Sequence, residues 1–174
     1  MKLDIVAGSG NDEFYTPEYA IMPLVKYLKL RGFRSIWCPF DTEQSNFVKV
    51  LLRQGFTVFY SHISDGLDFF TCPVPQCDAV VSNPPYSKKA EVFDRLFGIG
   101  KPFAMLVGVV GLFESDRRFS LFEKNPFEIM YFNKRISYFK SYDEQKPSLN
   151  PPFSSVYVTY GILPKQICFE RIEK

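Results

Sequence analysis

The stretch CDAVVSNPPYSKK (77–89) sets an apolar run directly against two adjacent prolines. Residues 77–81 have the β-branched, apolar character of a buried strand. Proline fixes its own φ and cannot donate to a sheet ladder, so the strand is expected to end at the prolines. The loop that follows presents backbone carbonyls, the Asn83 amide oxygen and the ring of Tyr86. Two acceptors and a stacking plane suit a flat ring with an exocyclic amino group. The same residues also suit a plain turn before a helix, with Ser87 as its N-cap.

The composition is that of a folded protein. The chain has 174 residues, 46% of them apolar, with 19 Phe and 10 Tyr, which excludes a disordered chain and predicts one domain over residues 1–174. The formal charge of +2 argues against a strong non-specific nucleic-acid binder but leaves room for local basic patches. The longest apolar run, 103–113, is too short to span a membrane.

The cysteines and the N-terminus indicate a cytoplasmic protein. No apolar signal region begins the chain, so we expect reduced cysteines and no membrane association. The cysteines are Cys38, Cys72, Cys77 and Cys168, and their spacing relative to the single histidine does not match that of zinc ligands. We therefore expect no metal site.

Strand-like and helix-like patterns alternate along the chain. We expect a loose arm over 1–12, then a helix that begins at the Thr-Pro-Glu sequence of 16–18, kinks at Pro23 and ends near Gly32. Strands are expected at 35–38, 56–60, 77–81, 103–108, 127–132 and 154–162, helices at 45–54, 88–100 and 116–125, and a polar loop, which includes a second Asn-Pro-Pro sequence, at 133–153. This alternation predicts an α/β fold, with a doubly wound, mostly parallel sheet and helices on both faces. Such folds bind ligands at the carboxyl ends of their strands.

The order of these segments and the Asn-Pro-Pro-Tyr sequence resemble the S-adenosylmethionine-dependent N6-adenine DNA methyltransferases, especially the small phage and prophage enzymes. The resemblance covers nearly the whole chain and implies a Rossmann-like methyltransferase domain without a separate target-recognition domain. In that family Asn-Pro-Pro-Tyr is the catalytic motif, which implies that Asn83, Pro84, Pro85 and Tyr86 are catalytic here. The Asn83 side-chain oxygen and the Pro84 carbonyl would accept the hydrogens of the adenine amino group, and Tyr86 would stack on the flipped base.

The resemblance also implies a binding site for S-adenosylmethionine. EFYTPEYAI (13–21) is similar to the Thr-Pro motif that lies against the methionine end of the cofactor. CPFDTEQSNF (38–47) occupies the place of the cofactor loop after the first strand, YSHI (60–63) that of the ribose contact, and DGLDFF (65–70) that of the adenine contact. The implied cofactor residues are Tyr15, Thr16, Pro17, Cys38, Pro39, Phe40, Asp41, Ser45, His62, Asp68 on the adenine amino group and Phe69 on the adenine ring.

The cofactor segments depart from the family pattern at several positions. The usual glycines are missing from the first loop, and Cys38 stands where an acidic residue is expected. We expect Asp41 to supply the missing negative charge. His62 stands where a ribose-binding carboxylate is usual and can make a single hydrogen bond there. Each residue also has a structural interpretation: Asp41 as a charge at a helix N-terminus, His62 as a half-buried residue at a strand end, and Asp68 as a turn residue.

DNA is the expected partner, and the contacts to its phosphates are expected from basic pairs in loops near strand ends. The pairs are Lys88 with Lys89, Arg117 with Arg118, and Lys134 with Arg135, although each also suits a solvated face. Two alternatives remain open. The same chemistry serves adenine in RNA or a glutamine amide in a protein. The altered first loop also suits a degenerate methyltransferase fold that binds nucleic acid or a partner protein without turnover.

Overall fold

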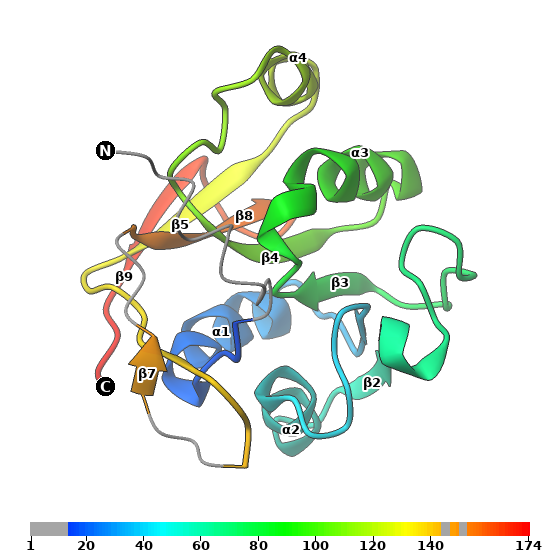
Figure 1. Ribbon diagram of the computed structural model, residues 1–174, viewed down its shortest axis with the longest axis vertical. Helices are drawn as coiled ribbons and strands as arrows, with labels where there is room; N and C mark the ends of the chain where they lie inside the picture. Colours follow the sequence, from blue (N-terminus) through cyan, green and yellow to red (C-terminus); the bar gives the residue numbers. More distant parts are fainter. Residues whose placement is uncertain (1–13, 144–146, 150–152) are drawn as a thin grey trace.

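The computed structural model describes residues 14–143, 147–149 and 153–174, and the expected N-terminal arm lies outside them. A seven-stranded sheet with the order β2-β1-β3-β4-β8-β5-β9 forms the centre of the molecule (Figure 1). Its strands are β1 Ser35–Cys38, β2 Thr57–Tyr60, β3 Ala79–Ser82, β4 Phe103–Gly108, β5 Glu128–Phe132, β8 Ser155–Tyr160 and β9 Ile167–Glu170. Strand β8 is antiparallel to both neighbours, β4 and β5, and the other pairs are parallel.

Helices cover both faces of this sheet. They are α1 Met22–Leu30, α2 Asn46–Arg53, α3 Lys89–Ile99 and α4 Asp116–Lys124, with short 3-10 turns η2 Glu18–Ala20, η3 Ile63–Asp65 and η4 Tyr86–Lys88. Helices α1 and α2 lie on one face and α3 on the other (Figure 1). The alternation of strand side chains divides the core accordingly, because Ile36 packs with α1 and α2 whereas its neighbour Trp37 packs with α3. The predicted α/β fold with a mostly parallel sheet is confirmed.

The predicted first helix begins later than expected. Pro17 precedes the short turn η2, and α1 begins only at Met22, so Pro23 lies in its first turn. The prediction of a kink at Pro23 was therefore wrong. Proline lacks an N–H, and the first turn of a helix is the place where that donor has no partner to lose. The two prolines thus mark two successive starts instead of one long kinked helix.

The predicted loop at 133–153 contains ordered structure. Strands β6 Tyr138–Phe139 and β7 Pro147–Leu149 pair there, and Ile136 and Tyr138 are buried in the core. Strand β9 was not predicted, because only Cys168 of its four residues is buried and the alternation is too short to recognise. Within the described ranges, no helix has the length and apolar character that crossing a membrane requires.

Candidate functional site

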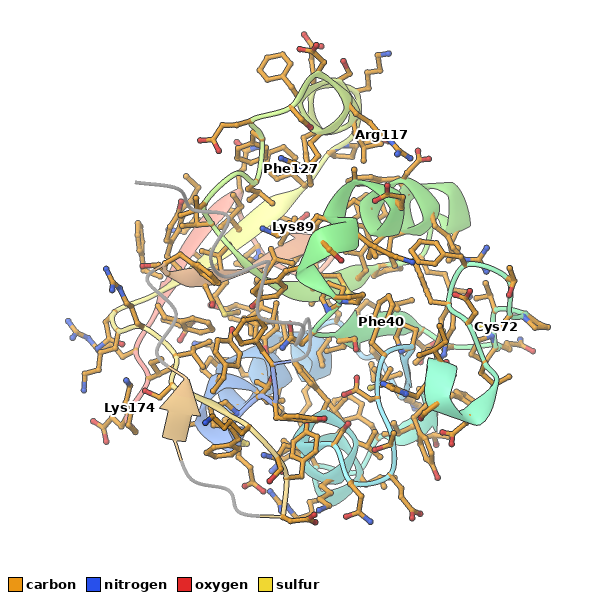
Figure 2. The ribbon with its side chains drawn as sticks, in the orientation of Figure 1. Phe40, Cys72, Lys89, Arg117, Phe127 and Lys174 are labelled. Atoms are coloured by element: carbon orange, nitrogen blue, oxygen red, sulfur yellow. The ribbon has the colours of Figure 1, made fainter. Side chains whose placement is uncertain are left out.

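A cavity of about 690 Å³ lies at the carboxyl ends of β1, β2 and β3. Eight of the predicted catalytic and cofactor residues line it: Tyr15, Phe40, Asp41, Ser45, His62, Asp68, Asn83 and Pro85. The other lining residues are Lys88, which was expected to contact DNA, and Phe14, Thr42, Ile63, Ser64, Phe70, Ser141, Tyr142 and Asp143, which were not predicted. Phe40 lies near the middle of the molecule, beside β3 (Figure 2).

The Asn83 amide is held in one orientation. Its Nδ2 donates to the Phe14 carbonyl oxygen at 2.7 Å and to Thr16 Oγ1 at 3.1 Å. A carbonyl oxygen can only accept, so the amide atom that faces it must be the nitrogen. The other atom, Oδ1, is buried and has no hydrogen-bond partner among the described residues. Buried acceptors are normally paired, so the unpaired Oδ1 makes Asn83 a candidate for binding a hydrogen-bond donor of a ligand.

Aromatic residues from distant parts of the chain surround Tyr86. Its ring stacks on Phe14, with centroids 4.9 Å apart and planes 25° apart, and the Phe153 ring lies 5.8 Å away. Its hydroxyl bonds to that of Tyr138 at 3.1 Å, and the Tyr138 hydroxyl donates to Ser155 Oγ at 2.7 Å. Burial raises the pKa of Tyr86 to about 12, so the phenol stays neutral. A base that stacks on the covered face of Tyr86 must displace Phe14.

The ring of Phe153 belongs to the second Asn-Pro-Pro sequence, which was interpreted as part of a loop. Its ring lies 5.8 Å from that of Tyr86, whereas the Asn-Pro-Pro residues 150–152 themselves lie outside the described residues. The position of Gly108, at the end of β4, makes room for this ring, because a Cβ there would lie 2.7 Å from it. Nothing in the local sequence indicates this proximity, because it depends on the pairing of β4 with β8.

Asp41 gives the cavity wall a buried carboxyl group. Ser82 donates its hydroxyl to Asp41 Oδ2 at 2.5 Å, and the Asp41 backbone N–H donates to the Ser61 carbonyl at 3.1 Å. Burial raises the pKa of Asp41 to about 6, while hydrogen bonds from Ser82 and Ser45 act in the opposite direction. At neutral pH the carboxylate is therefore mainly ionised and suits a cationic ligand group.

The segment 141–143 forms another wall that the sequence did not reveal. The ring of Tyr142 meets that of Tyr15 edge to face, with centroids 4.6 Å apart. Burial and the nearby charge of Asp41 raise the pKa of the Tyr142 phenol, which stays neutral. Sequence reasoning assigned this segment to a polar loop, and the only signal it carries is an aromatic residue within polar surroundings.

Asp68 and Phe70 line the cavity, whereas the predicted ring of Phe69 does not. Asp68 Oδ1 accepts the Phe70 backbone N–H at 2.9 Å, as a turn residue does, and the residue also lines the cavity. Phe69 is only 2% exposed and packs on Trp37 and Phe40 instead of lining the cavity. The ring that lines the cavity is that of Phe70, not that of Phe69.

Four other predicted cofactor residues do not line the cavity. Thr16 is buried and supports Asn83, and Pro17 precedes η2. Pro39 is buried, and Cys38 is fully buried beneath α1 and α2. Burial raises the pKa of the Cys38 thiol, so this residue does not supply a negative charge at the end of β1. Of the two carboxylates that follow β1, Asp41 lines the cavity and Glu43 is exposed.

His62 lines the cavity at the end of β2 and also caps η3. Its Nδ1 accepts the Ser64 backbone N–H at 3.1 Å. An imidazole that accepts at Nδ1 carries its proton on Nε2 when it is neutral. His62 therefore has a structural role in the loop in addition to its place in the cavity wall.

The predicted basic residues differ in their surroundings. Lys88 lines the cavity, and Lys89 lies over the Tyr86 ring. Arg117 forms ion pairs with Glu91 and Asp94, whereas Arg118 has a buried side-chain nitrogen without a partner in the described structure. Lys134 and Arg135 follow β5 and are exposed. The four cysteines are free and buried. Over the described ranges, no cluster of His, Cys, Asp or Glu side chains is suited to hold a metal ion.

No protein-family model and no curated protein sequence matches this chain. Among solved structures, it is similar to a modification subunit assigned to a type I restriction enzyme of Vibrio vulnificus YJ016, with a TM-score of 0.53 and 13% identity. The similarity covers 90% of this chain but only 46% of the subunit, so the chain spans about half the length of that protein. At this identity the comparison shows a shared α/β fold.

Proposed function

We propose that this protein is an S-adenosylmethionine-dependent methyltransferase that methylates the exocyclic N6 amino group of adenine in DNA. The observation that carries the proposal is the buried, unpaired Oδ1 of Asn83 at the wall of a cavity at the strand ends. An amino group is the complement of such an acceptor, and the Asn-Pro-Pro-Tyr resemblance supports the same assignment. The neighbour's description as a modification subunit agrees with it, whereas the small phage or prophage type remains a prediction from the sequence alone.

Asn83 is suited to orient the adenine amino group. Adenine N6 is a weak nucleophile, because its lone pair is delocalised into the ring. Acceptance of its two hydrogens by Asn83 Oδ1 and the Pro84 carbonyl favours a more tetrahedral nitrogen with a directed lone pair. The contacts of Asn83 Nδ2 with Phe14 and Thr16 fix the orientation of the acceptor before the base arrives, although the base itself must displace the Phe14 ring from Tyr86. No strong general base is needed before transfer, because the nitrogen becomes acidic once it is methylated.

The cavity residues fit S-adenosylmethionine, which supplies an electrophilic methyl group when bound. Asp41 offers a carboxylate for the ammonium or sulfonium group, and Asp68 offers an acceptor for the adenine amino group. The ring of Phe70 offers a face for the cofactor's adenine, and Phe40 adds apolar wall. These residues come from the loops after β1 and β2, where doubly wound folds bind nucleotides.

The alternative substrates differ in shape. Once Phe14 is displaced, Tyr86 offers an aromatic face on which a planar base stacks better than the flexible side chain of a glutamine. Adenine in RNA fits this arrangement as well as adenine in DNA. The degenerate, non-catalytic alternative rests on the missing glycines of the first loop and predicts no cofactor binding.

Methyl transfer to defined substrates tests the proposal. Labelled S-adenosylmethionine is offered with adenine-containing DNA, with RNA and with a glutamine peptide, and labelled nucleosides are identified after digestion. We expect N6-methylated deoxyadenosine from the wild type, and a loss of about 10²–10³-fold or more in kcat in Asn83→Ala, as is typical when one hydrogen bond to the reacting group is removed. Asn125→Ala is the matched control, since Asn125 bonds only to a backbone carbonyl of α4 among the described contacts.

Full activity of a folded Asn83→Ala protein would overturn the assignment of the site. Label found only in RNA or in the peptide would keep the chemistry and replace the substrate.

A further inference from the structure

Two cations from different helices, Lys89 and Arg118, are absent from the lining of the cofactor cavity, and Lys89 lies beside Tyr86. Lys89 is the first residue of α3, and its Nζ lies 5.3 Å from the centre of the Tyr86 ring. Figure 2 shows Lys89 centrally, between α3 and the strands beneath it. The ammonium group donates to the carbonyls of Gly108 at 3.3 Å and Val110 at 3.4 Å, which leaves a third proton for another acceptor.

Arg118, in the first turns of α4, is the second cation. Burial lowers the pKa of Lys89, and the charge of Arg118 lowers it further, while Glu114 acts in the opposite direction. The geometry agrees, because a Cβ at Gly111 would lie 3.8 Å from Arg118 Nη2, and the carbonyl of the preceding residue, Val110, accepts from Lys89 Nζ. The Arg118 Nε is buried, and no described residue accepts its hydrogen. A buried donor without an acceptor is costly, and a bound anion would supply the acceptor.

The neighbouring Arg117 provides a contrast within the same helix. Its guanidinium pairs with Glu91 at 3.3 Å and with Asp94 at 3.6 Å, both on α3, and Figure 2 shows it directed toward that helix. No carboxylate of the described chain forms a comparable ion pair with Lys89 or Arg118. Arg117 is thus ion-paired with α3, whereas the carboxylate that lies near Lys89 and Arg118, that of Glu114, forms no ion pair with either among the described residues.

We propose that Lys89 and Arg118 bind a backbone phosphate of the nucleotide whose base enters at Tyr86. The inference rests on the proposed function, and it identifies the substrate class as a nucleic-acid strand. A base that reaches Tyr86 has phosphates on either side of it along the strand, and a guanidinium with an ammonium is a strong partner for phosphate. A glutamine side chain carries no such anion.

Salt-dependent DNA binding tests the inference. The binding of a fluorescein-labelled, adenine-containing DNA duplex is followed by anisotropy over a series of salt concentrations. Each lost phosphate contact reduces the slope of log K against log salt by about 0.9. We expect that reduction in Arg118→Gln, its restoration in Arg118→Lys, and an unchanged slope in the control Arg117→Gln. Thermal unfolding of each variant and calorimetric titration with S-adenosylmethionine establish that the fold and the cofactor site are intact.

The outcomes separate this inference from the proposed function. An unchanged slope in Arg118→Gln, an equal reduction in Arg117→Gln, or a wild type that does not bind the duplex would overturn the phosphate site. Lys89→Met provides a second variant and is expected to reduce the slope as Arg118→Gln does. If the slopes follow the prediction but no methyl group is transferred to DNA, the phosphate site stands and the proposed catalytic activity falls.

Discussion

At the scale of single residues, burial and hydrogen bonding fix the orientation of the Asn83 amide and the surroundings of the Asp41 carboxyl group. Asn83 uses both protons of its amide on Phe14 and Thr16, which leaves its oxygen unpaired. Asp41 is buried with hydroxyl donors around it, so it keeps a carboxyl group in a place where a charge is expensive. Such costs are typical of functional sites, because an unliganded site must hold groups whose partner is the ligand.

The cost at Asp41 predicts a pH-dependent stability difference. The pKa of Asp41 is about 6 in the folded protein and 3.8 ordinarily, so between these values the folded state binds the proton more tightly. Its contribution therefore becomes less favourable as the pH rises from about 4 to 6, and the penalty persists above 6. We expect Asp41→Asn to match the wild type near pH 4 and to exceed its unfolding free energy by up to about 3 kcal/mol at pH 7.

Urea unfolding at pH 4, 5, 6 and 7 measures this difference, with the exposed Asp65→Asn as control. A constant difference between Asp41→Asn and the wild type over this range would show that Asp41 is not a buried, costly carboxyl group.

At the scale of elements, long periodic segments were predictable and short or composite ones were not. The pattern of 77–100 predicted β3 and α3, because the apolar strand, the prolines and the helical period agree with one another. Strands β6 and β7 have two and three residues, too few to show a period, and β9 has a single buried residue among its four. The surroundings of Tyr86 combine positions 14, 138 and 153, which only tertiary pairing brings together.

Helix α3 also holds the loop that carries Asp68 and Phe70. Arg95 on this helix donates from Nη1 to the Phe70 carbonyl at 3.0 Å and from Nη2 to the Cys72 carbonyl at 2.9 Å. Its guanidinium lies 5.3 Å from the centre of the Phe69 ring. We expect Arg95→Met to lower the unfolding free energy by about 3 kcal/mol, since charged hydrogen bonds are lost and carbonyls are left unpaired. The affinity for S-adenosylmethionine should fall with it.

Urea unfolding and calorimetric titration measure the two effects. Arg53→Met is the control, because Arg53 makes a solvent-exposed ion pair with Glu18 that water screens. If Arg95→Met lowered stability no more than Arg53→Met, the loop would not depend on α3.

At the scale of the whole molecule, the sheet places the residues of the proposed site at the carboxyl ends of its strands. The loops after β1, β2 and β3 form the cavity, and Tyr86 and Lys89 follow at the start of α3. The alternation of strands and helices predicted these strand ends as the place for ligands, and the cavity lies there. The contribution of segment 141–143 was not predictable, because it reaches the cavity through a connection between β6 and β7.

The most direct measurement is a calorimetric titration of the purified protein with S-adenosylmethionine, beside the variants Asp68→Asn and Asp65→Asn. Asp68→Asn keeps an oxygen for the Phe70 N–H and loses the second acceptor, whereas Asp65 does not line the cavity. We predict binding by the wild type and Asp65→Asn, and binding about tenfold weaker or more by Asp68→Asn, as expected for the loss of about 1.4 kcal/mol. A folded wild type that does not bind the cofactor would contradict the proposed function and favour a binding protein that retains a methyltransferase fold.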